Sequence, residues 1–190
     1  MMRMTRESLG RLSGLLGAFA FLVLYSVAAT LDSRYVFGEN YLSDLGVGEG
    51  AWAFNSGLIV AGLMLVVFSY FGLGPVLGKG VLRILGTVLL MVSAILLMGI
   101  GVFTENAGDI HRALSLAFFL EALIAVGVVD VALYKSRSLG RFGPAVSTAS
   151  FVFGICLLPF GATPLVETIA VFDIIAWGVL ISIGLVTKRD

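Results

Sequence analysis

Three residue types that together perform acyl transfer occur in two distant segments of this sequence. A serine and an aspartate are adjacent at Ser43 and Asp44, and the only histidine is His111. In acyl transfer, a histidine takes the proton of a serine nucleophile while a carboxylate orients the histidine. A Ser-Asp dipeptide is also a common turn or cap, and a lone histidine also fits a packing role. Both interpretations of these residues stay open from the sequence.

Acidic residues also occur inside apolar runs, where a charge is costly. Glu121 lies ten residues past His111, which on a helix is about 15 Å deep and close to the bilayer centre. A charged side chain there costs at least about 2.5–3.5 kcal/mol, so such residues usually face the interior and have a role. A protonated Glu121 bonded to a neighbouring helix is the structural alternative. Asp173 lies less deep in the membrane, about seven residues into the last span. Asp130 lies near Lys135 at the inner interface, where snorkelling or pairing explains it.

Further polar residues accompany these groups near one side of the predicted membrane. Asn55 lies one turn inside an apolar run, and Glu105 lies shortly before His111. Asp109 or Asn106 is expected to cap the helix that carries His111, because an acid suits a positive helix N-terminus. The candidate polar site therefore contains six residues: Ser43, Asp44, Asn55, Glu105, His111 and Glu121.

The elements that position these residues are apolar helices. The chain is 59% hydrophobic and only 13% charged, and its mean hydropathy of +1.07 is too high for a soluble fold. Six stretches have the roughly 20 apolar residues that cross a bilayer. We predict an all-α, polytopic transmembrane bundle forming one domain over residues 1–190, with helices at about 12–31, 51–73, 82–103, 110–134, 143–160 and 166–186.

Lysine and arginine predict the orientation of this bundle. Only Arg34 and Arg112 fall at one side of the predicted membrane, whereas alternate ends of the spans collect the other ten basic residues: Arg3, Arg6, Arg11, Lys79, Arg83, Lys135, Arg137, Arg141, Lys188 and Arg189. Short cytoplasmic loops carry such an excess of positive charge. We therefore expect a multi-pass protein of the cell membrane with both termini in the cytoplasm.

The longest connection, residues 32–50, lies on the outer side and carries an apolar pair. Leu42 and Leu45 would be buried if the loop folded inward over the mouth of the bundle. We expect this folding to bring Asp44 close to the segment 105–111. His111 or Arg112 would then neutralise one of the two acids, Asp44 and Glu105.

Composition also excludes several classes of chemistry. A single histidine excludes bis-histidine haem within one chain, and it excludes a multi-histidine zinc site unless carboxylates replace the missing ligands. Cys156 is the only cysteine, which excludes a cysteine metal cluster. No glycine-rich phosphate loop follows a strand. The basic residues are spread over four segments, which indicates orientation and no nucleic-acid binding. No cofactor and no metal are expected.

Two outer segments and the start of the second helix resemble a known family. Residues Tyr41–Gly46, Phe54–Gly57 and Gly99–Phe103, continuing through Ile110-His111, resemble a prokaryotic family of six-helix membrane proteins of unknown function, and the likeness covers nearly the whole chain. More remotely, the Ser-Asp loop and the later Gly-x-Phe…His pattern look like the eukaryotic DRAM, Sfk-type and GPI-remodelling Frag-type proteins. The resemblance points to Ser43, Asp44, Asn55 and His111, and its remote part implies work on lipids or lipid anchors.

Three functional hypotheses follow from the sequence. The first is lipid handling, by binding or by modification, at a site facing the outer leaflet, with membrane lipids as partners. The second is a small proton-coupled transporter that uses Glu121 and Asp173. The third is a non-enzymatic scaffold, in which the partner is a second copy or another membrane protein. Whether the protein is an enzyme stays open at this stage.

Overall fold

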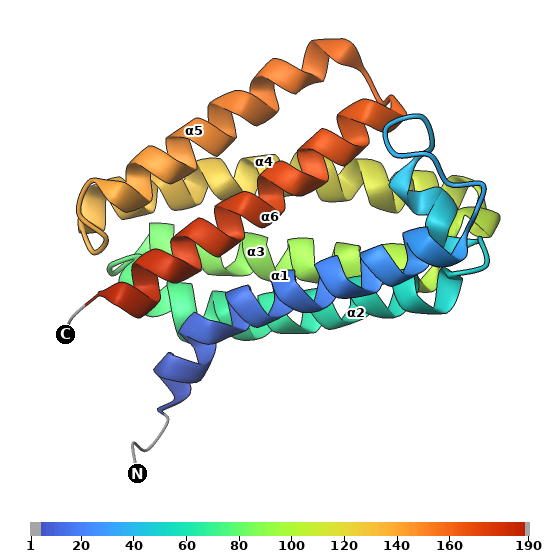
Figure 1. Cartoon of the computed structure of the whole chain (residues 1–190). Coiled ribbons are helices and arrows are strands. Elements are labelled where there is room, and N and C mark those ends of the chain that lie inside the picture. Colours follow the sequence, from blue (N-terminus) through green and yellow to red (C-terminus); the bar gives the residue numbers. More distant parts are fainter. Residues whose placement is uncertain (1–4, 189–190) are drawn as a thin grey trace.

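A computed structural model describes residues 5–188 and confirms the predicted all-helical class (Figure 1). Within these residues the chain forms six helices long and apolar enough to cross a membrane. Their bounds are α1 Arg6–Leu31, α2 Ala51–Val67, α3 Val81–Val102, α4 Asp109–Ser136, α5 Phe142–Leu157 and α6 Pro164–Thr187. The protein is therefore membrane-embedded. Of the basic residues used to predict orientation, Arg3 and Arg189 lie outside the described residues.

Local sequence signals set the helix ends. Thr5 accepts a hydrogen bond from the backbone N–H of Ser8, so α1 begins at Arg6, earlier than the expected position 12. Thr163 caps α6 in the same way, followed by proline at the first helical position. The expected cap of α4 is wrong: Gly108, with φ 59°, precedes the helix and makes no side-chain cap. Asp109 instead pairs with Arg112 one turn later.

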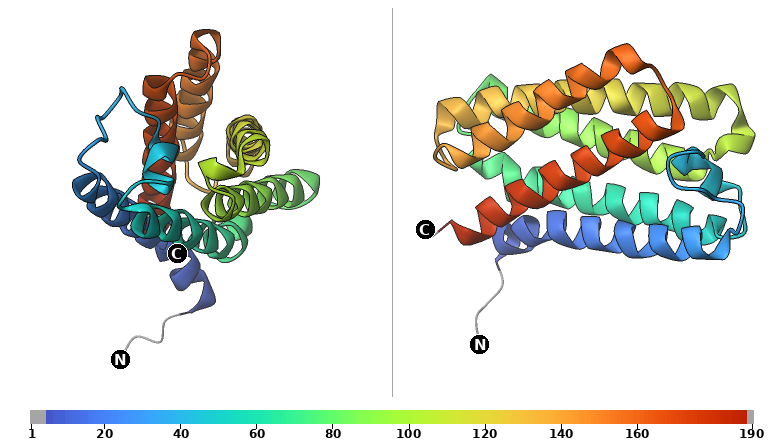
Figure 2. Two further views of the ribbon diagram at one scale, coloured as in Figure 1. Left: turned by 90° about the vertical axis from the view of Figure 1, so that its right-hand side faces the viewer. Right: turned by 45° about the horizontal axis from the view of Figure 1, so that its top comes forward.

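Each helix packs against the next in the chain, and α6 returns to pack against α1 (Figure 2). The six helices therefore surround a common interior. The start of α1 and the end of α6 lie at one end of the bundle (Figure 1). We call the opposite end, which holds residues 32–50, 103–108 and 161–163, the outer end, following the charge prediction.

Helix α2 continues beyond Val67 in an altered form. Residues Phe68–Leu73 form a π-helical turn, which leads into a short 3₁₀ turn at Gly74–Val76. Here Gly72 meets Gly10 of α1 so closely that a methyl group added to Gly10 would lie 2.4 Å from the Gly72 nitrogen. Backbone approach through small residues is a common way to pack helices in lipid. The glycines of α1 therefore hold α1 against the inner end of α2.

Candidate functional site

The interior contains a cavity of about 150 Å³ that is lined by residues of α1, α2, α3, α4 and α6. Helix α4 packs on α3 and α5, and α6 packs on α1 and α5, so α4 and α6 each form a separate wall. On α4 the lining runs from Ser115 to Val126, and on α6 from Glu167 to Gly178. Each wall therefore extends about 16 Å along its helix. Most of the lining side chains are apolar, and the cavity is elongated along the bundle.

Polar residues gather at the outer end of this cavity. Ser43, Ser115 and Glu167 line it there, next to Leu42. They come from three different elements, namely the 3₁₀ turn η1 at Leu42–Gly46, helix α4 and helix α6. Ser13 and Ser93 also line the cavity, and their hydroxyls donate to Gly10 and Glu121. The cavity thus has a mainly apolar body and a polar outer end.

The first outer loop folds inward, as expected from its sequence. Leu42 and Leu45 are buried, at 2% and 0% exposure. The backbone N–H of Leu42 donates to Glu167 Oε2 at 2.9 Å, and the Tyr41 hydroxyl donates to the carbonyl of Ala162 at 2.9 Å. These two bonds attach η1 to the start of α6. Asn55 secures the other end of η1, because its Nδ2 donates to the carbonyl of Gly46 at 2.9 Å.

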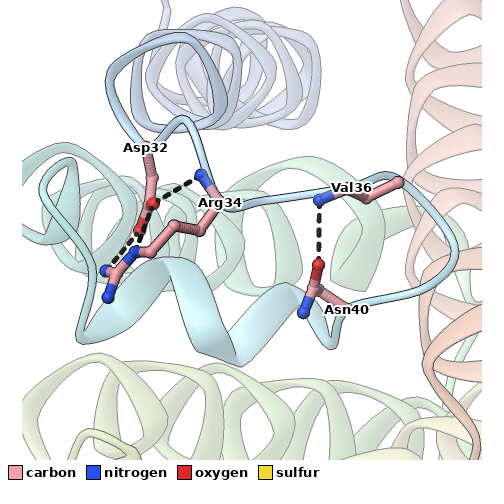
Figure 3. A network of polar contacts seen from close by, with 4 residues as sticks. All are labelled: Asp32, Arg34, Val36 and Asn40. Atoms are coloured by element: carbon pink, nitrogen blue, oxygen red, sulfur yellow. Dashed lines mark hydrogen bonds and ion pairs between the residues drawn. The ribbon is translucent and has the colours of Figure 1, made fainter.

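The part of the loop that precedes η1 is held by its own polar contacts (Figure 3). Arg34 binds both carboxylate oxygens of Asp32, with Nε–Oδ1 at 3.1 Å and the second nitrogen–Oδ2 at 3.2 Å. These hydrogen bonds from Arg34 hold the pKa of Asp32 below its usual value. The backbone N–H of Val36 donates to Asn40 Oδ1 at 2.9 Å. These bonds fix the part of the loop that leads into η1.

Three acids from different elements lie at the outer end. Asp44 lies in η1, Glu105 in the turn η4 at Glu105–Ala107, and Glu167 in the first turn of α6. Turn η1 packs on η4, and burial together with the neighbouring Asp44 carboxyl raises the pKa of Glu105. The structure therefore brings Asp44 to the segment that begins at Glu105, as the sequence predicted.

The cations expected to neutralise this pair are bound elsewhere. Arg112 pairs with Asp109, and Asp44 Oδ2 instead accepts the backbone N–H of Tyr41 at 3.0 Å. His111 is buried, and its ring nitrogens contact Phe103 and Ser115. The reason is local: an arginine three residues after an acid on one helix meets that acid first.

His111 has two defined partners. Its Nδ1 lies 2.8 Å from the carbonyl oxygen of Phe103, and its Nε2 lies 3.4 Å from the hydroxyl of Ser115. A carbonyl oxygen can only accept, so Nδ1 carries the proton and Nε2 is left to accept from Ser115. Phe103 follows the last residue of α3. The end of α3 therefore fixes both the orientation and the tautomer of the ring.

Glu121 faces the bundle, as predicted, and is bonded to a neighbouring helix. Ser93 of α3 donates to Glu121 Oε2, while Oε1 is buried without a hydrogen-bond partner among the described residues. Ser93 itself lines the cavity. Glu121 thus lies behind the cavity wall, apart from the acids of the outer end.

Asp173 and Asp130, which also lie within the spans, each accept a hydrogen bond from a hydroxyl of a neighbouring helix. Ser150 of α5 donates to Asp173 Oδ2 at 2.7 Å, and Thr148 of α5 donates to Asp130 Oδ2 at 2.8 Å. The expected pairing of Asp130 near Lys135 is therefore replaced by a bond to a hydroxyl of the next helix. A hydroxyl on an adjacent helix donates to one carboxyl oxygen in each of the three pairs, Glu121–Ser93, Asp130–Thr148 and Asp173–Ser150.

Two cavity residues, Ser115 and Glu167, were not predicted as site residues. Ser115 lies four residues after His111, a spacing that places both on one face of a helix, which was the available signal. Glu167 had no comparable signal, since an acid in the first turn of a helix is ordinary. Only the fold shows that it lines the cavity beside η1.

These features define a membrane-embedded six-helix protein with an interior apolar cavity and an acidic outer end. The chain belongs to the family described as "Protein of unknown function (DUF998)", whose model matches residues 15–184. No curated protein and no solved structure matches the chain. The resemblance to a prokaryotic family of unknown function is thus confirmed, whereas the remote likeness to the eukaryotic families has no support among these comparisons.

Proposed function

We propose that the protein binds a membrane lipid, with hydrocarbon in the cavity between α4 and α6 and the polar headgroup at the outer end. The observation that carries this proposal is the distribution of polarity along the cavity. Its walls are mainly apolar, and Ser43, Ser115 and Glu167 line its outer end. An amphiphile has the same distribution of polarity along its length.

The size and shape of the cavity support a hydrocarbon ligand. Its 150 Å³ equals the volume of an engineered apolar cavity that stays dry and binds benzene. The lining extends about 16 Å along α4 and α6, which suits part of an extended hydrocarbon chain.

The acids of the outer end restrict the headgroup. Ionised carboxylates only accept hydrogen bonds, so Asp44, Glu105 and Glu167 favour a headgroup that donates, through hydroxyl or ammonium groups. A phosphate group would have to lie away from them, because like charges repel. We therefore expect a headgroup rich in donors.

The proposed orientation places this site at the outer leaflet. The lysines and arginines that collect at the opposite end indicate a cytoplasmic location for that end. A lipid would then enter from the outer leaflet of the cell membrane.

Proton-coupled transport is a second candidate, which one observation favours. Ser93 lines the cavity and donates to Glu121, so a carboxyl group at membrane depth is one hydroxyl away from the interior space. The two functions make different predictions for Glu121→Gln. Lipid binding survives this change, whereas a proton relay through Glu121 is blocked by it.

Photoreactive lipid labelling tests the lipid proposal. The purified protein is placed in vesicles that contain a phosphatidylethanolamine, whose ammonium group donates hydrogen bonds, with a diazirine in its acyl chain. The labelled residues are mapped by mass spectrometry. We expect labels on cavity residues of α4 and α6, such as Phe119 and Ile175. Labels confined to outward-facing residues, such as Leu120 and Leu180, would contradict the proposal.

Two matched alanine variants sharpen this test. Ala122 lines the cavity at 5% exposure, so Ala122→Phe places a ring in the space proposed for the chain. Ala176 is exposed on the outer face of α6, so Ala176→Phe adds the same ring facing the bilayer. We expect severalfold weaker cavity labelling in the first variant and wild-type labelling in the second. Equal labelling in both would refute the cavity as the binding site.

A further inference from the structure

We propose that Ser115 is the nucleophile of an acyl-transfer site and that His111 is its general base. This inference rests on the proposed lipid binding and adds a reaction to it. The ligand class is a lipid whose acyl chain is linked through an ester, and the reaction class is transfer of that acyl group to water or to another hydroxyl.

The hydrogen bonds of His111 leave one ring nitrogen able to take a proton, as a general base requires. The Phe103 carbonyl accepts the Nδ1 proton at 2.8 Å, so Nε2 has a free lone pair directed to the Ser115 hydroxyl at 3.4 Å. In serine hydrolases a carboxylate usually fixes this tautomer, and here a backbone carbonyl does so. A separation of 3.4 Å is long, but nucleophile–base bonds are often loose before substrate binds.

The hydroxyl of Ser115 is paired with a histidine ring, whereas those of Ser93 and Ser150 donate to acids. Ser26 and Ser69 each donate to the backbone carbonyl four residues earlier, at 2.8 Å and 2.6 Å. That is the common partner of a serine within a helix. The hydroxyl of Ser115 is paired with the His111 ring instead. Its oxygen is thus next to a base and not engaged as an ordinary helix contact.

Ser115 also lies where an ester group would be. It lines the outer end of the cavity together with Ser43 and Glu167, between the apolar body and the acids. In a bound lipid, the ester lies between the hydrocarbon chain and the headgroup. His111, one turn closer to the outer end on the same face of α4, is buried at 6% exposure.

The reaction is balanced without any further cofactor. Ser115 Oγ attacks the ester carbonyl carbon while His111 Nε2 takes the hydroxyl proton. The C–O bond to the alcohol then breaks, and His111 gives that proton to the leaving oxygen, which yields acyl-Ser115 and a free lipid alcohol. Water or a second alcohol then attacks the carbonyl carbon of acyl-Ser115 and gives its proton to His111 Nε2. The bond from that carbon to Ser115 Oγ breaks, and His111 returns the proton to Oγ, which restores both residues. Neither step is a redox reaction.

The structure also decides between two serines. Ser43 is the serine that the sequence pairs with an acid, and it lines the same end of the cavity. The hydroxyl bonded to the base is that of Ser115. We therefore expect Ser115→Ala to abolish covalent chemistry.

A fluorophosphonate, which reacts covalently with base-activated serines, tests this proposal. The full-length protein in lipid nanodiscs is incubated with the reagent, and the modified residue is identified by mass spectrometry. We expect one label, on Ser115, that is absent in Ser115→Ala and retained in Ser26→Ala, which removes a hydroxyl bonded to the backbone of α1. In His111→Gln, whose amide can still bond to the Phe103 carbonyl, labelling should slow by at least about a hundredfold. Any variant that fails to fold is recognised by gel filtration, and the wild-type and Ser115→Ala results still decide.

Each outcome has a defined meaning. No label in the wild type, a label on Ser43, or an unchanged rate in His111→Gln would overturn the acyl-transfer proposal. Photoreactive lipid labelling of the same samples separates this failure from failure of the lipid proposal. Cavity labelling without fluorophosphonate labelling overturns only the acyl-transfer site. Absence of cavity labelling in the wild type overturns the binding proposal itself.

Discussion

The bond between Ser93 and Glu121 joins α3 to α4 within the membrane and provides a quantitative test of the packing. Ser93 is 2% exposed, and Glu121 Oε1 is already without a partner among the described residues. Ser93→Ala therefore leaves the carboxyl group with no hydrogen bond in the described structure. Leaving a buried polar group unsatisfied costs about 1–3 kcal/mol. We expect Ser93→Ala to lower the free energy of unfolding by about that amount.

Replacing Glu121 should lower the free energy of unfolding less than replacing Ser93 does. In Glu121→Met, an apolar chain of similar length replaces the acid, and the Ser93 hydroxyl can turn to a backbone carbonyl of its own helix. The coupling energy of the double-mutant cycle isolates the bond itself. Hydrogen bonds between membrane helices average about 0.6 kcal/mol and reach about 1.7 kcal/mol in such cycles. A value in this range is expected for Ser93 and Glu121.

Reversible unfolding in mixed micelles, or steric trapping in bicelles, measures these energies. The pair Ser150 and Asp173, joined at 2.7 Å, is a positive control, and combining Ser93→Ala with Asp173→Leu is a negative one because these residues share no bond. Distant sites add within about 0.3–0.5 kcal/mol. A Ser93–Glu121 coupling no larger than that of the negative control would show that the contact is not formed and would refute the reasoning.

Other predictions test the orientation, the glycine contact and the outer loop. Lys79→Cys should react with membrane-impermeant maleimide only after the membrane is opened, and labelling of intact cells would contradict the topology. Gly10→Ala, whose methyl group would lie 2.4 Å from a backbone nitrogen, should cost about 1–3 kcal/mol of stability. Gly178→Ala, with nothing within 4 Å, should cost nothing, and equal losses would refute this contrast. Arg34 lowers the pKa of Asp32, so this pair stabilises the fold above the ordinary carboxyl pKa and the effect is lost as the pH falls toward the depressed one. Arg34→Gln should therefore lower the melting temperature at pH 7 and make it less sensitive to acid, and an unchanged acid profile would contradict this.

The fold was predictable because the membrane leaves few solutions. Runs of about 20 apolar residues become helices, since every backbone polar group must be satisfied within lipid. The helix ends were less predictable, because they depend on single residues. Thr5 extends α1 beyond the expected start, and Gly108 displaces Asp109 as the cap of α4.

The candidate site was predictable only in part, because its geometry depends on contacts between distant segments. Leu42 and Leu45 indicated that the first loop folds inward, and both are buried. The partner of His111 was not predictable from residue types, since Ser43 has the more suggestive neighbour. The structure selects Ser115 because it shares a helical face with His111, at 3.4 Å.

The pairing of intramembrane acids shows the same limit. Depth alone predicted that Glu121 needs a partner, because an unpaired acid in lipid is costly. It could not indicate that Ser93 would supply the hydroxyl, or that Thr148 would bind Asp130. These choices depend on how the helices are rotated against one another, which composition does not encode.

The measurement that tests the central proposal most directly is an experimental density map of the protein in lipid nanodiscs. We predict continuous, chain-shaped density between α4 and α6, beside Phe119 and Ile175, that ends in a headgroup near Ser43 and Glu167. A map in which this space is empty, or is filled by the protein's own side chains, would contradict lipid binding in the cavity.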